Sequence, residues 1–282
     1  MAEALAPGSS ANLGPGFDTL ALALEITCRV TAVPSDRWSV VHHGAHAPEA
    51  GDDDAVLLAA RSAVGEGFPL ALEVYNDIPL GRGLGSSAAA FVTGAAAALR
   101  AAERDAEPSH VLRIAADLEG HSDNVAASVF GGLVAAVGTV VRPLLLHPSL
   151  RIVIAVPSRR LPTKWARQAL PEIIDHDVAA RSVARVVALV EAFRTADPEL
   201  FGAAAGDELH EGPRGPLFPE AEDLMFTARS AGAMHACWSG AGPSILAVVE
   251  AETVEAVAAA LSATLEGAGS ILTPGVALEG LR

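Results

Sequence analysis

The alternation of hydrophobic and polar positions along the chain predicts separate strands and amphipathic helices. Leu70–Asn76 alternates with a period of two, which is typical of a half-buried strand, and Leu20–Val33 is rich in β-branched residues from Ile26 onward. Ala88–Arg100 is an apolar run of helical length. Further strands are expected at Trp38–His42, Phe130–Val141, Arg151–Val156, Ala233–Trp238, Ile245–Val249 and Gly275–Leu278, and further helices at Ala55–Val64, Val111–Glu119, Asp177–Phe193, Asp197–Asp207, Glu220–Ala231 and Thr253–Glu266. This mixture predicts the α+β fold class.

Residues that interrupt regular structure indicate where the elements begin and end. The acidic run Asp52–Asp54 is expected to cap the helix that follows it, and Pro213–Pro219 is expected to be a loop rich in proline and glycine. Pro157-Ser158 breaks an apolar strand and is the best candidate for a crossover between domains. We therefore expect two domains, residues 1–156 and residues 157–282.

The composition allows a large core and excludes several kinds of partner. Hydrophobic residues make up 51% of the 282 positions and aromatic residues only 4%, so the core is expected to consist mainly of Leu, Val, Ile and Ala. The formal net charge is -15, and such a surface repels nucleic acids and anionic membranes, which need clustered Lys and Arg. The single lysine is Lys164, so an anionic substrate must find its positive charge mainly at arginines.

Neither the cysteines nor the apolar segments indicate export or membrane insertion. Cys28 and Cys237 lie far apart and form no CxxC or Cys/His cluster, so we expect two buried free thiols, with a secreted disulfide as the alternative. Residues 1–7 lack the basic region and the long apolar run of a signal peptide. No apolar stretch reaches the roughly 18 residues expected of a transmembrane helix. The sequence thus predicts a soluble, cytoplasmic protein that binds neither nucleic acid nor membrane.

A loop rich in glycine and serine is the clearest chemical signal in the sequence. It reads Pro79-Leu80-Gly81-Arg82-Gly83-Leu84-Gly85-Ser86-Ser87-Ala88 and joins a predicted strand to a predicted helix. Glycines let backbone N–H groups approach an anion closely, and a helix start favours negative charge. The serine hydroxyls are placed to cap that helix or to reach a magnesium ion. A capped helix after a glycine turn is the simpler alternative, but three glycines and two serines exceed what a cap needs.

Two familiar phosphate-binding patterns do not fit this loop. The Walker pattern ends in Gly-Lys-Ser/Thr, and because no lysine is present here, backbone dipoles and Mg²⁺ must carry most of the charge neutralisation. The dinucleotide fingerprint GxGxxG is not met, because Gly81–Ser86 reads GxGxGS. No acidic residue follows about 20 residues later at the end of a second strand, as that fingerprint requires. The loop therefore predicts a phosphate cradle of another kind.

Four motifs in a fixed order resemble those of the GHMP kinases, a family named for galactokinase, homoserine kinase, mevalonate kinase and phosphomevalonate kinase. Pro79–Ala90 resembles the second motif of the family, and Ser239–Ser244 resembles the third. Ser10–Asp18 resembles the first motif in the form typical of the homoserine kinases. Glu119–Asn124 resembles their Glu-Gly-His-Pro-Asp-Asn stretch, with Ser122 in place of proline. Four ordered motifs over most of the chain are far more specific than one glycine turn.

The resemblance implies a fold, a reaction and an assembly. The fold would be an N-terminal α/β domain like the second domain of ribosomal protein S5, which binds ATP, joined to a ferredoxin-like C-terminal domain. The reaction would be phosphorylation of the side-chain hydroxyl of L-homoserine by ATP with Mg²⁺ as cofactor, giving O-phospho-L-homoserine, a step of threonine biosynthesis. A homodimer is the assembly that the family leads us to expect.

The resemblance also implies a set of substrate-binding residues. Asp18 would hold the ammonium of the substrate, and Asn12 lies across a glycine turn from it. Thr163 and Arg167 stand in a segment like the family's Thr-x-x-Ala-Arg, and Arg214 ends a segment like its His-x-x-x-Arg. The two arginines would bind the carboxylate, which suits the fork of a guanidinium. Taken singly, Asp18 would be interpreted as a turn residue and each arginine as a surface charge.

Residues for ATP and Mg²⁺ follow from the same resemblance. The loop of residues 79–88 would bind ATP together with Gly240 and Gly242 of the third motif. Ser87 and Glu119 would hold Mg²⁺, which usually takes only one or two protein oxygens beside phosphates and water. Alone, Glu119 at a helix end would be interpreted as an ordinary surface residue.

Catalysis is expected to rest on position and charge. Asn124 stands where mevalonate kinase relatives have a catalytic aspartate, and an asparagine cannot take a proton. With Glu119 and Ser87, Asn124 is therefore expected to act by positioning and electrostatics, which the loose transition state of phosphoryl transfer tolerates. His121 is the alternative base, although a histidine in this motif can simply hydrogen-bond the loop.

Two other functions remain open at this point. One is a GHMP kinase for another alcohol, such as mevalonate or a sugar, against which Asn12, Asp18 and Asn124 argue. The other is a non-catalytic relative that binds ATP, against which the presence of Glu119 and Ser87 argues.

Overall fold

The structure is a computed structural model that describes residues 1–48, 51 and 53–282. Its strands are β1 (Ala2–Ala11), β2 (Leu20–Pro34), β3 (Ser39–His43), β4 (Leu70–Asn76), β5 (Leu133–Val137), β6 (Val140–Leu144), β7 (Leu150–Pro157), β8 (His235–Trp238), β9 (Ile245–Glu250) and β10 (Gly269–Leu272). Its α-helices are α1 (Ala55–Val64), α2 (Ser86–Ala101), α3 (Pro108–Glu119), α4 (Asp123–Phe130), α5 (Thr163–Gln168), α6 (His176–Thr195), α7 (Pro198–Ala204), α8 (Glu211–Arg214), α9 (Glu220–Ser230) and α10 (Val254–Leu265).

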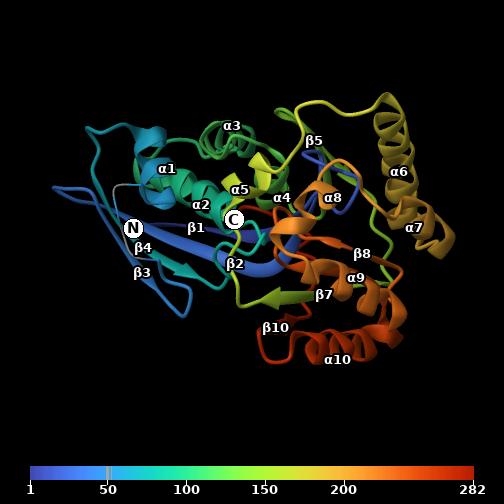
Figure 1. Cartoon of the computed structure of the whole chain (residues 1–282). Coiled ribbons are helices and arrows are strands. Elements are labelled where there is room, and N and C mark those ends of the chain that lie inside the picture. The colour runs from blue at the N-terminus through green and yellow to red at the C-terminus, as the bar shows by residue number, and fades with distance from the viewer. Residues whose placement is uncertain (49–50, 52) are drawn as a thin grey trace.

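The strands form two sheets, each with helices packed against it (Figure 1). The first sheet has the order β3-β4-β2-β5-β6, and β1 also pairs with β2. The second sheet has the order β10-β7-β9-β8. Helices and strands are thus mixed without a regular βαβ repeat, and the predicted α+β class is confirmed.

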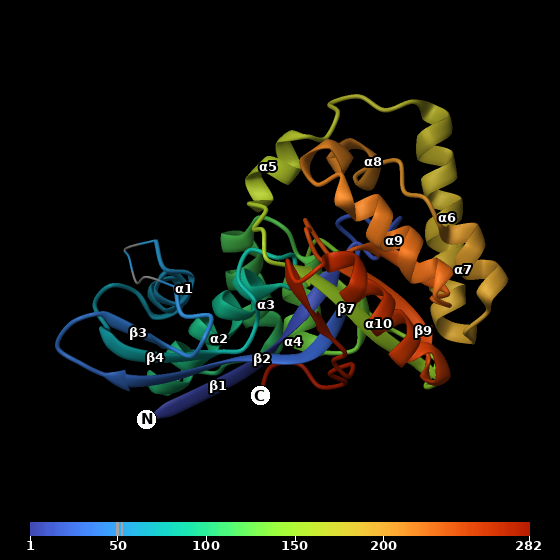
Figure 2. The same cartoon turned by 60° about the horizontal axis from the view of Figure 1, so that its bottom comes forward.

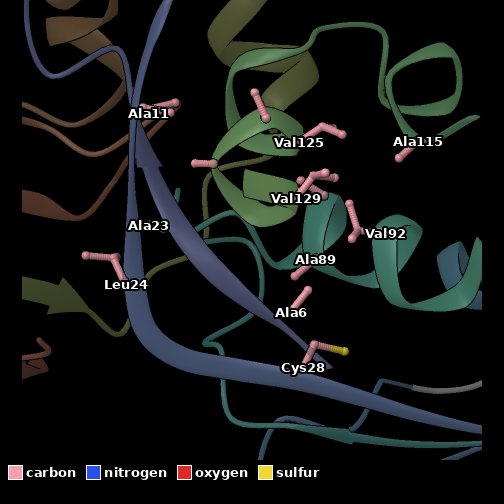
Figure 3. Close-up of a cluster of buried hydrophobic side chains, with 14 of the residues drawn as sticks. Ala6, Ala11, Ala23, Leu24, Cys28, Ala89, Val92, Ala115, Val125 and Val129 are labelled. Atoms are coloured by element: carbon pink, nitrogen blue, oxygen red, sulfur yellow. The ribbon is translucent and has the colours of Figure 1, made fainter. Parts of the chain in front are cut away.

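The core of the first sheet is built mainly from small apolar residues. Where α2 packs against this sheet, Ala6 of β1 and Cys28 of β2 face Ala89 and Val92 of the helix (Figure 3). All four side chains are buried, and the small alanines let the helix lie close to the sheet. This packing holds the start of α2, and with it the glycine loop, against the end of β1.

The second sheet is covered on both faces, and alternate side chains of its strands pack into two different hydrophobic clusters. Val153 of β7 and Ile245 of β9 face a cluster formed with α9 and α10. Ile154 and Leu246 point the other way, into the larger cluster that also contains α6 and α7. Figure 2 shows the chain running from β7 through α5 to α6 along the outer side of the molecule. The segment that carries Arg167 therefore follows a strand that is buried at every position except Arg151.

Several predicted elements need correction. Phe130–Val141 is not one strand: α4 ends at Phe130, and the hairpin of β5 and β6 turns at Gly138, which has a φ of +59°. Gly275–Leu278 makes only an isolated bridge between Val276 and Leu24. Most of the predicted loop Pro213–Pro219 lies in α8 and a following 3-10 turn, because the carboxylate of Asp207 caps the start of α8.

Other predictions agree with the structure or lie outside it. Asp54 caps α1 by accepting a hydrogen bond from the amide of Leu57 at 3.1 Å, whereas Asp52 lies outside the described residues. Cys28 and Cys237 are buried free thiols, as predicted. In the described part of the chain, no helix is both long and apolar enough to cross a membrane. The predicted division into two domains between residues 156 and 157 stays a prediction. Strand β7, which ends at Pro157, pairs with strands of the second sheet.

Candidate active site

One hollow beside the start of α2 gathers the predicted substrate and metal residues. Its lining includes Asn12, Asp18, Ser87, Glu119, Asn124, Thr163, Arg167 and Arg214. The glycines and serines of the loop also line it, together with Gly240 of the third motif. These residues come from six separate parts of the sequence, so the fold brings together the groups that the motifs singled out.

Some residues predicted to bind ATP do not line this hollow. Ala88 is fully buried in α2, and Gly242 packs against the indole of Trp238. Pro79 lies outside it as well, while Leu80 lines a neighbouring hollow. Direct contact of these four residues with ATP stays a prediction.

Arg82, the one charged side chain of the loop, points away from the hollow. Its Nε donates to the carbonyl of Pro157 at 2.7 Å and its Nη2 to the carbonyl of Ser158 at 2.6 Å. Arg82 thus fastens the loop to the end of β7. The predicted phosphate cradle would consequently rely on backbone N–H groups and the start of α2. In the described residues, no side-chain hydrogen bond caps this start of the helix.

The third motif is fixed to both the loop and the first motif. The hydroxyl of Ser239 donates to the carbonyl of Gly83 at 2.7 Å and lies 2.8 Å from the hydroxyl of Ser10. The carbonyl of Gly240 accepts a hydrogen bond from Nδ2 of Asn12 at 3.0 Å. Oδ1 of Asn12 in turn accepts from the amide of Asp18 at 3.0 Å. Asn12 therefore shapes the turn that presents the Asp18 carboxylate, at a φ of +68° that asparagine tolerates.

Arg214 is a buried guanidinium held by uncharged acceptors. It donates to the carbonyls of Ala166 at 3.2 Å and Gly240 at 3.2 Å, and to Nδ1 of His210 at 3.0 Å. Burial lowers the pKa of His210 to about 4, so this imidazole is neutral and donates from Nε2 to the carbonyl of Gly14. Burial also lowers the pKa of Arg214 to about 10, which leaves it charged near neutral pH.

Glu119 and Ser87, which are predicted to hold Mg²⁺, contact each other in the hollow. Ser87 Oγ donates to Glu119 Oε2 at 2.7 Å, and burial raises the pKa of the Glu119 carboxyl. Burial alone would lower the pKa of His121, but the hydrogen bond to Asp123 and the negative charges of Asp123 and Glu119 together outweigh burial and raise this pKa. A carboxylate and a hydroxyl are hard oxygen donors of the kind that Mg²⁺ takes.

Asn124 lines the hollow, and a buried hydrogen bond fixes its side-chain amide. Its Oδ1 accepts a hydrogen bond from the hydroxyl of Ser9 at 2.9 Å, and Ser9 is fully buried in β1. Because Ser9 already donates to the oxygen, we infer that Nδ2 is the group offered to a ligand in the hollow. Asn124 is therefore arranged to donate a hydrogen bond, which fits its predicted role of positioning without a base.

Three residues of this site had no role in the sequence analysis. Ser9 orients Asn124 but stands in a strand with no motif to mark it. His210 orients Arg214, and the spacing of four residues between them was the available signal. Phe17 stacks on His210 with ring centroids 5.2 Å apart and lies 5.8 and 5.5 Å from the guanidinium carbons of Arg167 and Arg214.

Comparison with known families agrees with this geometry. A glycine loop at a helix start beside a carboxylate and a hydroxyl defines a phosphoryl-transfer site of the small-molecule kinase type. The model of the GHMP kinases N terminal domain matches residues 54–132, and that of the GHMP kinases C terminal domain matches residues 189–267. The chain belongs to the GHMP kinase family, and the predicted fold is confirmed.

Individual relatives narrow the comparison. A protein named homoserine kinase from Thermus thermophilus is 38% identical over 96% of this chain and 94% of the relative. One from Gloeobacter violaceus is 36% identical over 98% of this chain and 96% of the relative. The crystal structure of homoserine kinase from Cytophaga hutchinsonii superposes with a TM-score of 0.86 at 27% identity, covering 100% of this chain and 96% of that one. Mevalonate kinase of L. major, at 16% identity and a TM-score of 0.76, shares the fold.

Proposed function

We propose that this chain phosphorylates the side-chain hydroxyl of L-homoserine with ATP, giving ADP and O-phospho-L-homoserine in threonine biosynthesis. The observation that carries the proposal is that Asp18, Arg167 and Arg214 line the same hollow as the glycine loop. An amino-acid alcohol needs one carboxylate for its ammonium and guanidinium groups for its carboxylate. The relatives named homoserine kinase that match nearly the whole chain support the same substrate.

The hydroxyl and the γ-phosphate would meet between the substrate residues and the loop. The hydroxyl oxygen forms the new P–O bond, the bond between the γ-phosphorus and the β–γ bridging oxygen breaks, and the hydroxyl proton passes to a phosphoryl oxygen. Nδ2 of Asn124 donates to the attacking oxygen and fixes its direction, while backbone N–H groups of the loop stabilise the phosphates. The chain thus supplies orientation and charge, and no protein base is required.

The donor set at Ser87 and Glu119 fits a magnesium ion. Both oxygens line the hollow next to the glycine loop, and within the described residues no larger cluster of acidic, histidine or cysteine side chains competes for a metal. A Mg²⁺ ion held there would supply positive charge that neutralises part of the charge of the ATP phosphates. Glu119 and Ser87 would hold it beside the loop, which lacks lysine.

The nucleoside of ATP is assigned to the neighbouring hollow. That hollow shares Ser86 and Ser87 with the first and is lined by more apolar side chains, among them Val56, Val74 and Leu80. A planar base needs such apolar walls, and because both hollows share the two serines, a base bound here would lie next to the phosphates.

The homodimer and the cytoplasmic location stay predictions.

A panel of alcohols tests the proposed function. ADP release is measured with L-homoserine, mevalonate, galactose and no alcohol, in the presence of ATP and Mg²⁺. We expect kcat/KM for homoserine to exceed that for the other alcohols by at least about 100-fold, since two desolvated charge contacts distinguish it. Activity on mevalonate or galactose but not on homoserine would show that homoserine is not the substrate. ATP binding without ADP release on any alcohol would indicate a non-catalytic relative.

A further inference from the structure

Asp18 and Arg167 satisfy each other inside the substrate site. Nη1 and Nη2 of Arg167 donate to Oδ2 and Oδ1 of Asp18 at 3.0 and 2.8 Å, which is a two-point ion pair. The pair joins the turn after β1 to the last turn of α5, 149 positions along the chain. Both side chains are 37% exposed, so a small solute can reach them. A substrate that binds either group therefore competes with the other member of the pair for it.

Arg214 differs from Arg167 because its charge is not balanced at short range. Its hydrogen bonds go to two carbonyls and to neutral His210, and among the described residues no carboxylate lies within ion-pair distance of it. Arg214 is only 2% exposed. Glu119 and Asp123, the other carboxylates that line the hollow, lie within ion-pair distance of His121, so among the substrate residues Asp18 and Arg167 balance each other while Arg214 has no carboxylate beside it in the described structure. A carboxylate can bind Arg214 first without opening the Asp18–Arg167 pair.

We infer that the Asp18–Arg167 pair makes the site selective for alcohols that carry an ammonium and a carboxylate together. A zwitterion supplies a replacement for both partners: its ammonium takes the place of Arg167 at Asp18, and its carboxylate receives Arg167 beside Arg214. One ion pair is exchanged for two, and neither Asp18 nor Arg167 is left unpaired. The inference rests on the proposed function in placing the substrate in this hollow.

Alcohols with only one of the two charges lack this exchange. 4-Hydroxybutyrate, which is homoserine without its ammonium, offers a carboxylate to Arg214 and nothing to Asp18. It either leaves Arg167 on Asp18 or draws it away and strands the Asp18 carboxylate. 3-Aminopropan-1-ol, which is homoserine without its carboxylate, must displace Arg167 while lying next to the unbalanced charge of Arg214. The closed pair therefore opposes the binding of either compound.

Two substitutions test this selectivity with opposite expected signs. Asp18→Asn frees Arg167, and asparagine tolerates the φ of +51° at this position. We expect Asp18→Asn to lower the Kd of 4-hydroxybutyrate by about 3- to 10-fold, the range for a partly exposed two-point ion pair. The same substitution should raise the Kd of homoserine by at least about 30-fold, because its ammonium loses the Asp18 carboxylate. Arg167→Gln frees Asp18 and is expected to tighten the Kd of 3-aminopropan-1-ol by about 3- to 10-fold.

The measurement is isothermal titration calorimetry of the full-length chain, with thermal unfolding to establish that each variant is folded. Glu191→Gln is the matched control, because Glu191 holds Arg194 in a similar two-point pair on α6, away from the hollow. It removes the same charge, and all three affinities should stay within about twofold of wild type. If Asp18→Asn leaves 4-hydroxybutyrate binding unchanged or weaker, the inference is wrong and Asp18 is only an ammonium ligand.

Binding needs no turnover, so the two proposals fail separately. Absence of homoserine phosphorylation by the wild-type chain would overturn the proposed function. The ratios of the Kd values between wild type and the two variants would still decide whether the ion pair excludes ligands with one charge.

Discussion

The guanidinium of Arg214 donates to Nδ1 of His210 at 3.0 Å, and both side chains are buried. Because Nδ1 accepts this bond, the ring proton is on Nε2, which lies 2.7 Å from the carbonyl of Gly14. A neutral histidine therefore links the glycine turn of the first motif to the arginine that is proposed to receive the carboxylate.

Removing this link should weaken substrate binding more than catalysis. His210→Phe keeps an aromatic ring beside Phe17 but removes both hydrogen bonds and leaves a donor of Arg214 unsatisfied. We expect the KM for homoserine to rise about 10-fold with a smaller change in kcat, and the free energy of unfolding to fall by about 1–3 kcal/mol. Steady-state kinetics and urea unfolding measure the two effects. A loss of stability with an unchanged KM would limit His210 to a structural role.

Glu211 should make stability depend on pH. Burial raises the pKa of this carboxyl to about 8, while it accepts a hydrogen bond from the amide of Trp238 at 2.7 Å. Its folded-state pKa lies above the unfolded value, so its contribution is complete below about pH 4.5 and is lost as pH rises through about 8.

Relative to Glu211→Gln, the wild-type chain should therefore lose stability by about 1.4 kcal/mol per pH unit across this window. Urea unfolding at pH 5, 6.5 and 8 measures the difference. Glu220→Gln, at an exposed position at the start of α9, is the control and should show no such trend. Parallel pH profiles for wild type and Glu211→Gln would contradict the expectation.

Asn124→Asp tests whether a donor or a base is needed at this position. The substitution keeps the acceptor for Ser9 but replaces the Nδ2 donor with a charged oxygen beside the phosphates. We expect kcat to fall by about 100- to 1,000-fold, as for the loss of one preorganised donor. Ser9→Ala should lower kcat by about 10-fold with little change in KM, because it loosens the orientation of Asn124. An Asn124→Asp enzyme as active as wild type would indicate that a carboxylate base serves here.

Glu119→Gln should change the dependence on magnesium. An amide oxygen carries no charge and holds Mg²⁺ less well than a carboxylate, and Ser87 loses its charged partner. We expect the Mg²⁺ concentration for half-maximal rate to rise by at least about 10-fold, the loss that one altered ligand contact commonly causes. Glu107→Gln, just before α3, serves as the control. An unchanged magnesium titration would remove Glu119 from the metal site.

Alanine substitutions at two glycines of the loop distinguish the cost of backbone strain from the cost of a steric clash. Gly83 and Gly81 have φ angles of +71° and +65°, so alanine costs about 1–2 kcal/mol of strain at either position. At Gly83 the added Cβ would lie 2.0 Å from the carbonyl oxygen of Ser239, whereas at Gly81 its nearest neighbours are 3.7 Å away.

We therefore expect Gly83→Ala to lose about 1–3 kcal/mol more stability than Gly81→Ala, because it forces the third motif away from the loop. The KM for ATP should rise by about 10-fold or more in Gly83→Ala, since the loop and the third motif would no longer share one geometry. Thermal unfolding and ATP kinetics on both variants measure these differences. Equal effects at the two positions would show that the contact with Ser239 is unimportant.

Local patterns predicted most elements but missed those that depend on distant contacts. The alternation in Leu70–Asn76 and the apolar run after the glycine loop correspond to β4 and α2. The strand β1 was not recognised, because Pro7 and Gly8 interrupt its pattern where its register against β2 shifts. The short helix α4, which carries Asn124, was not predicted, and only its last residue, Phe130, was expected, as the start of a strand. The helix has seven buried positions on all its sides and therefore shows no amphipathic periodicity.

The motifs located the candidate site, but its internal contacts required the structure. The resemblance to the GHMP kinases assigned Asp18 and Arg167 to opposite charges of one substrate, and nothing in the sequence indicated that they bind each other. Similarly, Arg82 was predicted to bind ATP as part of the loop, whereas its side chain donates hydrogen bonds to the carbonyls of Pro157 and Ser158. Such pairings between residues far apart in the chain leave no periodic or spacing signal.

The peptide group of Gly240 has a consequence for how substitutions combine. Its carbonyl accepts from Asn12 at 3.0 Å and from Arg214 at 3.2 Å, and its amide donates to the carbonyl of Ala11 at 3.0 Å. Changes at Asn12 and Arg214 therefore alter a shared acceptor, and their free energies will not add. These positions are expected to co-vary among homologues, and transplanting either motif alone into another scaffold would not reproduce its geometry.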